Sequence, residues 1–147
     1  MQKRKHNKGL SAVSGHFRRS EDGSFTLEAI IWMPIFAILL ALIMNITMVF
    51  YVESQMLRVV QDANRMVSLG RIAGETDDEA ETETETFVLA ELAYIDAPTM
   101  AVTTEINNGF VTTVLTAQAT DLMPFNFLRN SFSGIRVGVR AQHIIEY

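Results

Sequence analysis

The stretch Gly23–Val52, GSFTLEAIIWMPIFAILLALIMNITMVFYV, decides the fold of this chain. From Ala29 onward it contains 24 consecutive residues without Asp, Glu, Lys or Arg. At the helical rise of about 1.5 Å per residue this run spans about 36 Å, and the hydrocarbon core of a bilayer is about 30 Å thick. A buried helix of a soluble protein is the alternative, but apolar runs of that kind are usually about 10–14 residues long. We therefore predict a helix that crosses a membrane once.

The charges on either side of this segment predict its orientation. Residues 1–23 contain six basic and two acidic residues, a net charge of +4, whereas residues 24–147 contain six basic and fifteen acidic residues, a net charge of −9. Positively charged flanks stay in the cytoplasm. We therefore expect a basic cytoplasmic leader over residues 1–23, a bacterial inner-membrane location, and a periplasmic C-terminal domain. The basic residues of the leader match an anchor at the surface of membrane lipid. The acidic remainder would repel phosphate, so no nucleic-acid partner is expected.

The helical pattern continues beyond the membrane segment. Apolar residues recur at spacings of three and four from Val52 to Val67, and Gly70 and Gly74 follow as stop signals. One helix is therefore predicted from about residue 26 to about residue 71, roughly 68 Å long. We assign residues 24–72 to this transmembrane and extended helix.

Two residues stand out within the membrane segment. Pro34 has no N–H to offer the carbonyl of Ile30, which predicts a kink in the helix. Asn45 is the only amide of the segment. A hydrogen bond from Asn45 to another helix is one role for it, although such contacts average only about 0.6 kcal/mol in membranes.

Residues 73–86 form an acidic block, with six Asp and Glu residues between Glu75 and Glu83. Like charges at this density repel one another, which predicts a solvated linker. A Ca²⁺ site is the alternative, but the D-x-D-x-D-G loop pattern is missing. We expect a helix to begin only near Thr84 or Thr86 and to end before Pro98.

The remaining residues predict a small sheet. Residues 100–106 and 110–116 are rich in Val and Thr and flank an Asn108-Gly109 turn, the pattern of a β-hairpin. Residues 135–145 alternate between apolar and polar side chains and predict a third strand. Three antiparallel strands need a cover on one face, which the outer half of the long helix and a second helix can supply. The predicted fold class is α+β, with residues 87–147 as a small periplasmic head.

No combination of residues in the sequence predicts catalysis or a cofactor. The chain has no cysteine, which excludes disulfides and thiolate metal sites. His143 is the only histidine after residue 23, so it has no second His or Cys with which to bind a metal. No glycine-rich phosphate loop follows a predicted strand. We therefore expect no enzyme activity, no metal and no cofactor.

The segment Gly23-Ser24-Phe25-Thr26-Leu27-Glu28, which follows a basic leader and opens an apolar helix, resembles the recognition site of type IV prepilins. The resemblance implies that a prepilin peptidase cuts between Gly23 and Ser24. Glycine has no side chain, so the bond that is cut can enter an intramembrane protease in extended form. A carboxylate held against lipid is costly unless it is paired. For Glu28 the resemblance implies pairing with the newly freed terminal amine of a neighbouring subunit.

The wider segment EDGSFTLEAIIWMPIF, with an outward helix and a small domain of strands after it, resembles the TadE/TadF pseudopilins of the Tad (Flp, tight adherence) pilus system. The resemblance implies a minor pilin that is processed after Gly23 and required for pilus assembly, with Phe25 and Glu28 serving recognition and assembly. The implied partners are the prepilin peptidase, other pilin or pseudopilin subunits and the inner-membrane assembly platform. The alternative is an uncleaved, single-pass membrane-anchored periplasmic binding or adaptor protein.

Overall fold

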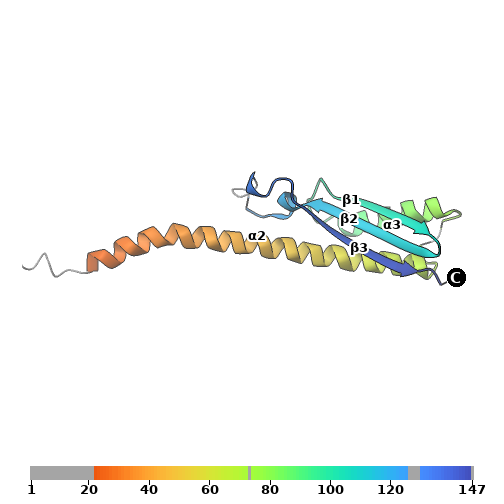
Figure 1. Cartoon of the computed structure of the whole chain (residues 1–147), viewed down its shortest axis with the longest axis horizontal. Coiled ribbons are helices and arrows are strands. Elements are labelled where there is room, and N and C mark those ends of the chain that lie inside the picture. The colour runs from red at the N-terminus through yellow and green to blue at the C-terminus, as the bar shows by residue number, and fades with distance from the viewer. Residues whose placement is uncertain (1–21, 73, 126–129, 147) are drawn as a thin grey trace, which may run out of the picture. The chain divides into compact units, whose positions relative to one another are not determined.

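The computed structural model describes residues 22–72, 74–125 and 130–146, so most of the basic leader lies outside it. The elements along the chain are α2 (Asp22–Ser68), α3 (Asp77–Glu91), β1 (Ala101–Asn107), β2 (Phe110–Gln118), η1 (Ala119–Leu122) and β3 (Arg136–Ile144) (Figure 1). The chain divides into two compact units, one up to Leu40 and one from Ala41 onward. A long apolar N-terminal helix precedes three antiparallel strands and a second helix, which confirms the predicted α+β class.

Helix α2 carries a segment suited to a membrane. Within the described residues one helix, over Thr26–Ser68, is long and apolar enough to cross a bilayer. In the first unit its large apolar side chains are exposed, and Met33, for example, is 71% exposed. A continuous apolar surface of this extent is rare on proteins that face only water. The composition of α2 is therefore that of a single-pass membrane anchor.

Helix α2 ends at a glycine, as predicted. Gly70 has a left-handed backbone with φ of +66°, which glycine adopts without steric cost. Its N–H donates to the carbonyl of Val67 at 2.9 Å, and the N–H of Arg71 donates to the carbonyl of Met66 at 2.8 Å. These two bonds make a Schellman motif, which satisfies carbonyls that the last turn leaves free. The last helical residue, Ser68, lies close to the predicted end near residue 71.

The sheet has the predicted hairpin and third strand. Its strand order is β1-β2-β3, with both pairs antiparallel. The turn between β1 and β2 places Asn108 and Gly109 at φ of 53° and 77°. Positive φ at both positions is what an Asn-Gly hairpin turn requires. The hairpin and the strand near residues 135–145 are therefore confirmed.

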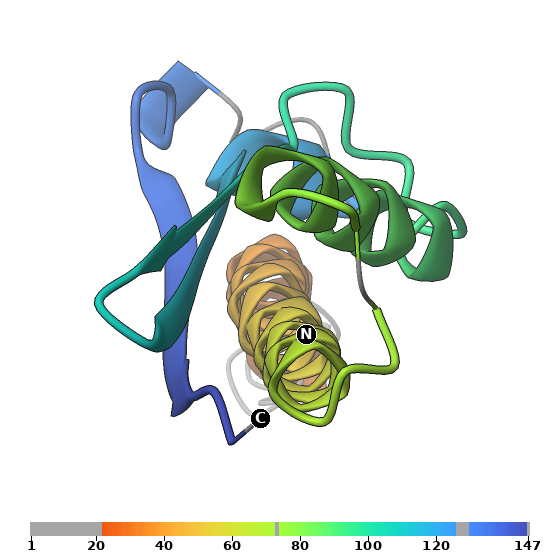
Figure 2. The ribbon, with the colours of Figure 1, turned by 90° about the vertical axis from the view of Figure 1, so that its right-hand side faces the viewer.

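The core of the second unit forms around the outer half of α2. Figure 2 shows the sheet on one side of this half-helix and α3 on another. One stripe of α2 is fully buried and consists of Val52, Met56, Val60 and Ala63. It packs against apolar side chains of α3 and of the sheet, among them Val88, Leu92, Leu115, Ala117 and Val139. Burial of each large apolar side chain contributes about 1.5–3 kcal/mol, so this stripe holds the second unit together.

The acidic block is helical where a linker was expected. Helix α3 begins at Asp77, and the N-cap Thr76 accepts the N–H of Glu79 on its hydroxyl oxygen at 3.3 Å. The Glu79 carboxylate in turn accepts the N–H of Glu75 at 2.8 Å, close to the reciprocal pattern of a capping box. Three acids in the first turn also interact favourably with the helix dipole.

The prediction of a solvated linker is therefore wrong for residues 77–86, and the helix begins well before the expected Thr84 or Thr86 cap. The physical reason is a buried stripe that the charges obscured. Every fourth residue of α3 is buried, namely Ala80, Thr84 and Val88. The acids between them lie on the remaining faces of the helix.

Two of these acids close one edge of the sheet. The Glu85 carboxylate accepts the backbone N–H of Thr104 at 2.8 Å, and the Glu81 carboxylate accepts that of Ile106 at 2.6 Å. Glu81 and Glu85 are one helical turn apart, and Thr104 and Ile106 are two residues apart on β1. These two spacings match, so each carboxylate reaches one N–H on the same edge. Helix α3 therefore satisfies two N–H groups on the edge of β1 and hinders pairing of that edge with another strand.

A buried polar network ties α2 to all three strands. The Thr113 hydroxyl donates to Oδ1 of Asn64 at 2.6 Å, and Nδ2 of Asn64 donates to the carbonyl of Ala141 at 2.9 Å. The hydroxyls of Thr104 and Thr113 lie 3.1 Å apart. Because every member has a partner, the network contributes to a unique packing of the helix on the sheet.

We expect Asn64→Ala to lower the free energy of unfolding of the second unit by about 1–3 kcal/mol. The replacement removes the hydrogen bonds that Asn64 makes with the buried Thr113 hydroxyl and with the carbonyl of Ala141. Hydrogen exchange of the β2 and β3 amides in detergent micelles measures this loss. The exposed Gln61 on the same helix supplies the control, since Gln61→Ala should change stability by less than about 0.5 kcal/mol. Equal effects of the two substitutions would contradict the role given to the network.

Candidate processing and assembly site

The predicted cleavage site lies at the very start of α2. Gly23, Ser24 and Phe25 follow directly on Asp22, the first helical residue. A peptidase that binds extended chain must unwind this turn. The first four N–H groups of a helix have no intrahelical partner, and glycine disfavours a helix by about 1 kcal/mol, so the turn is a weak part of α2.

Glu28 is a lone carboxylate in an apolar surface. Its side chain is exposed on α2, as are those of its neighbours Leu27 and Ile30, which are 65% and 66% exposed. Within residues 22–72, 74–125 and 130–146 no basic group forms an ion pair with it. If this surface lies in lipid, the charge needs a partner from another molecule, because an unpaired carboxylate is costly there.

Pro34 lies inside α2, as the sequence requires. Position 34 cannot donate to the carbonyl of Ile30, so the hydrogen-bond ladder of the helix has a gap at this point. The rings of Trp32 and Phe36 lie on either side of it in sequence, with centroids 6.3 Å apart. The predicted kink at Pro34 stays a prediction.

Asn45 has a different role from the one considered above. Its side chain is fully buried, with Nδ2 donating to the carbonyl of Phe125 at 3.3 Å and Oδ1 accepting the N–H of Phe125 at 3.1 Å. The amide therefore binds the segment after η1 in its own chain, and the hypothesis of a bond to another helix is wrong. Nothing in the sequence near residue 125 indicates this partner, since the two residues are 80 positions apart.

The second unit has a mostly apolar cavity of about 240 Å³, and the first residue that lines it, Met48, is three positions after Asn45. On α2 it is lined by Met48, Tyr51 and Val52, and across from them by Tyr94, Ile95, Leu122, Met123 and Pro124. Two carboxylates also line it, Asp96 and Asp121, and Asp121 already accepts both the N–H and the hydroxyl of Thr99. In the part of the chain that the structure describes, no three His, Asp or Glu side chains are grouped to bind a metal ion.

Comparison with known proteins bears on the helix rather than on the head. Residues 23–65 match the family model described as TadE-like protein. No curated protein and no solved structure matches the chain. The match begins at Gly23 and includes Glu28, Pro34 and Asn45, so it contains every residue considered for processing and assembly. Residues 23–65 of this chain are thus the TadE-like segment that the motif from Gly23 to Glu28 predicted.

Proposed function

We propose that this chain is a minor pilin, or pseudopilin, that a prepilin peptidase processes after Gly23 and that assembly of a Tad-type pilus requires. The observation that carries the proposal is the TadE-like match, which starts at the glycine of the cleavage motif. The chain acts as a structural subunit and not as an enzyme. It is anchored in the bacterial inner membrane with residues 1–23 in the cytoplasm and the head, residues 87–147, in the periplasm.

Cleavage after Gly23 would leave enough of α2 for one membrane crossing. Ser24 to Met44 comprises 21 residues, about 32 Å of helix, which is close to the thickness of a hydrocarbon core. The next residue, Asn45, hydrogen-bonds to Phe125 within the second unit. A mature chain that begins at Ser24 therefore has the length of helix that one membrane crossing needs.

The chemistry of Glu28 supports assembly through the new N-terminus. Cleavage frees the α-amine of Ser24, and the carboxylate of Glu28 on a neighbouring subunit is its partner. Two opposite charges attract about four times more strongly at an effective dielectric of about 20 than in water, so lipid favours this pair. The small side chains of Ala37 and Ala41 supply a place where a second helix can approach closely.

The partners under this proposal are the prepilin peptidase, other pilin or pseudopilin subunits, the inner-membrane assembly platform and membrane lipid. The second candidate function is an uncleaved, membrane-anchored periplasmic binding or adaptor protein. The cavity beside Tyr94 favours it, because apolar cavities with a few polar groups are typical of ligand sites.

Mapping the N-terminus of the protein from its native membranes tests the proposal. Intact mass and terminal sequencing should give a chain that begins at Ser24. A strain without the prepilin peptidase is the control and should give a chain that begins at Met1. If the protein from peptidase-containing cells also begins at Met1, the pilin proposal is wrong and the anchored binding module stands.

A further inference from the structure

We propose that the free edge of β3 binds an extended, acidic strand of a partner protein by strand addition. This site lies in the second unit and is separate from the processing and assembly site. The inference does not rest on the proposed pilus function, because it follows from the geometry of the sheet and from the charges beside β3. It concerns a protein that binds the head. The TadE-like match covers residues 23–65 and does not include β3, so it gives no information on this partner.

The register of the sheet identifies the free groups of β3. Ala119 donates to the carbonyl of Ile135, and Ile145 donates to the carbonyl of Gly109, both at 2.9 Å. Both pairs continue the β2–β3 register. Since bonded and non-bonded pairs alternate in an antiparallel ladder, odd-numbered residues of β3 bond to β2 and even-numbered residues face away from it. The outward residues are Arg136, Gly138, Arg140, Gln142 and Ile144, and all five residues are exposed.

Within residues 22–72, 74–125 and 130–146 these outward groups have no partner. No described residue forms a hydrogen bond with the backbone N–H or C=O of Arg136, Gly138, Arg140, Gln142 or Ile144 on that edge. On the opposite edge, β1, the outward N–H groups of Thr104 and Ile106 donate to Glu85 and Glu81 of α3. Proteins usually protect a long edge strand, and among the described residues such protection is found on β1 and not on β3. A nine-residue edge left open is therefore suited to another strand.

Arginine side chains lie on both faces of this edge and outnumber the acidic side chains beside them. On the solvent face of the sheet Arg136 and Arg140 are exposed. On the other face, a hollow between α2 and β3 is lined by Arg58, Arg65 and His143, together with Gln61 and Asp62. A second hollow at the end of β3 also includes Arg65 and His143, together with the acidic Glu146. An added strand would project its side chains alternately toward these two faces.

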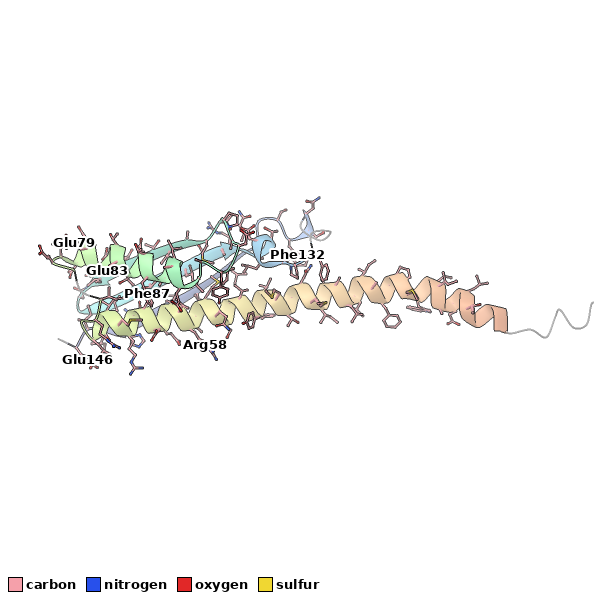
Figure 3. The ribbon with its side chains drawn as sticks, turned by 180° about the vertical axis from the view of Figure 1, so that it is seen from behind. Arg58, Glu79, Glu83, Phe87, Phe132 and Glu146 are labelled. Carbon is pink, nitrogen blue, oxygen red and sulfur yellow. The ribbon has the colours of Figure 1, made fainter. Side chains whose placement is uncertain are left out.

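The arginine side chains beside this edge have no acidic partner among the described residues. Among the described residues none of Arg58, Arg65, Arg136 and Arg140 forms an ion pair. Nδ1 of His143 is buried and has no hydrogen-bond partner there. Figure 3 shows Arg58 on the side of α2 that points away from Glu79 and Glu83 of α3. Asp62 and Glu146 line the same hollows, but the four arginines outnumber these two acids, so a partner with carboxylates complements the edge.

A second copy of this chain fits the edge less well. Antiparallel pairing of two β3 strands about Gly138 would place Arg136 opposite Arg140 on the same face, and pairing about Arg140 would place that residue opposite itself. Like charges directly opposite each other destabilise a strand pair. We therefore assign the edge to a different chain, one with Asp or Glu at alternating positions of an extended segment.

Binding of a labelled peptide to the full-length protein in detergent micelles tests the inference. The peptide alternates Glu with Thr and Val, and the matched peptide has Lys in place of every Glu. Fluorescence anisotropy should show at least tenfold tighter binding of the acidic peptide. Two further peptides carry N-methyl groups on alternate amides, one set on even and one on odd positions. Strand addition predicts that only one of the two loses binding, whereas equal affinity of both would overturn the inference.

Two protein variants locate the binding. Gln142→Pro removes an outward N–H from the edge without removing a bond to β2, and it should lower the affinity for the acidic peptide at least tenfold. Gln142→Ala keeps that N–H and should leave the affinity within about twofold of the unmodified protein. The double replacement of the exposed Arg58 and Arg65, Arg58→Glu and Arg65→Glu, should weaken binding similarly, and Arg71→Glu, the same replacement at one position outside both hollows, is the control. Unchanged affinity in the Arg58 and Arg65 variant overturns the inference even if Gln142→Pro does not fold.

Discussion

Replacing Gly23 with valine is expected to leave the chain uncut, so that the full 147 residues accumulate in the membrane. The first turn of α2 must open for the bond between Gly23 and Ser24 to reach a protease in extended form. Glycine offers no side chain at the point of closest approach, and a β-branched side chain would occupy that space. Intact mass of the protein from peptidase-containing cells measures the outcome.

Gly15→Val in the leader is the matched control for this prediction. It introduces the same side chain upstream of the cleavage site and should leave processing unchanged. Gly23→Ala is the milder variant and should slow or block cleavage. Normal cleavage of the Gly23→Val protein would mean that the glycine is not part of the recognition site, and would leave the processing proposal without its central residue.

Replacing Glu28 with alanine is expected to abolish fibre assembly while cleavage after Gly23 persists. Glu28 is exposed on an apolar stretch of α2 with no ion pair in the described residues, so its partner under our proposal is the amine of Ser24 on another subunit. Without the carboxylate, that amine would enter lipid as an unpaired charge, which is costly. Glu28→Gln keeps the shape and the hydrogen-bonding atoms but removes the charge, and should fail in the same way.

Counting pili by electron microscopy, alongside intact mass, separates the two steps for each variant. Glu53→Ala, which removes a carboxylate from the part of α2 in the second unit, is the control and should leave fibres intact. Normal fibres in Glu28→Ala cells would reject the pairing with the amine. Loss of cleavage in the same variant would instead assign Glu28 to peptidase recognition.

Local signals in the sequence were sufficient for most of the fold. The uncharged run after Glu28 predicted a membrane helix, Gly70 predicted its end, and Asn108-Gly109 predicted the hairpin turn. Each of these depends on the residue itself and its immediate neighbours, through backbone freedom or apolar length. The motif from Gly23 to Glu28 was likewise legible in the sequence, and the TadE-like match covers it.

The acidic block shows where local reasoning failed. Its charge density predicted a linker, but the Thr76–Glu79 cap and a buried residue at every fourth position make it helix α3. A spacing of four was present in the sequence, yet the small size of Ala80 and the polarity of Thr84 hid it. Burial against the sheet, which only the folded chain supplies, decided the outcome over repulsion among exposed carboxylates.

By itself the sequence determined what each segment can be: a long apolar helix that opens with the TadE-like segment at Gly23, a β-hairpin and a third strand. The tertiary structure alone decided which distant groups meet. It paired Asn45 with Phe125, placed Glu81 and Glu85 on the edge of β1, and left the edge of β3 open beside Arg58 and Arg65. The physical reason is range: helix ends and turns depend on neighbouring residues, whereas partners far apart in sequence meet only when the core has packed.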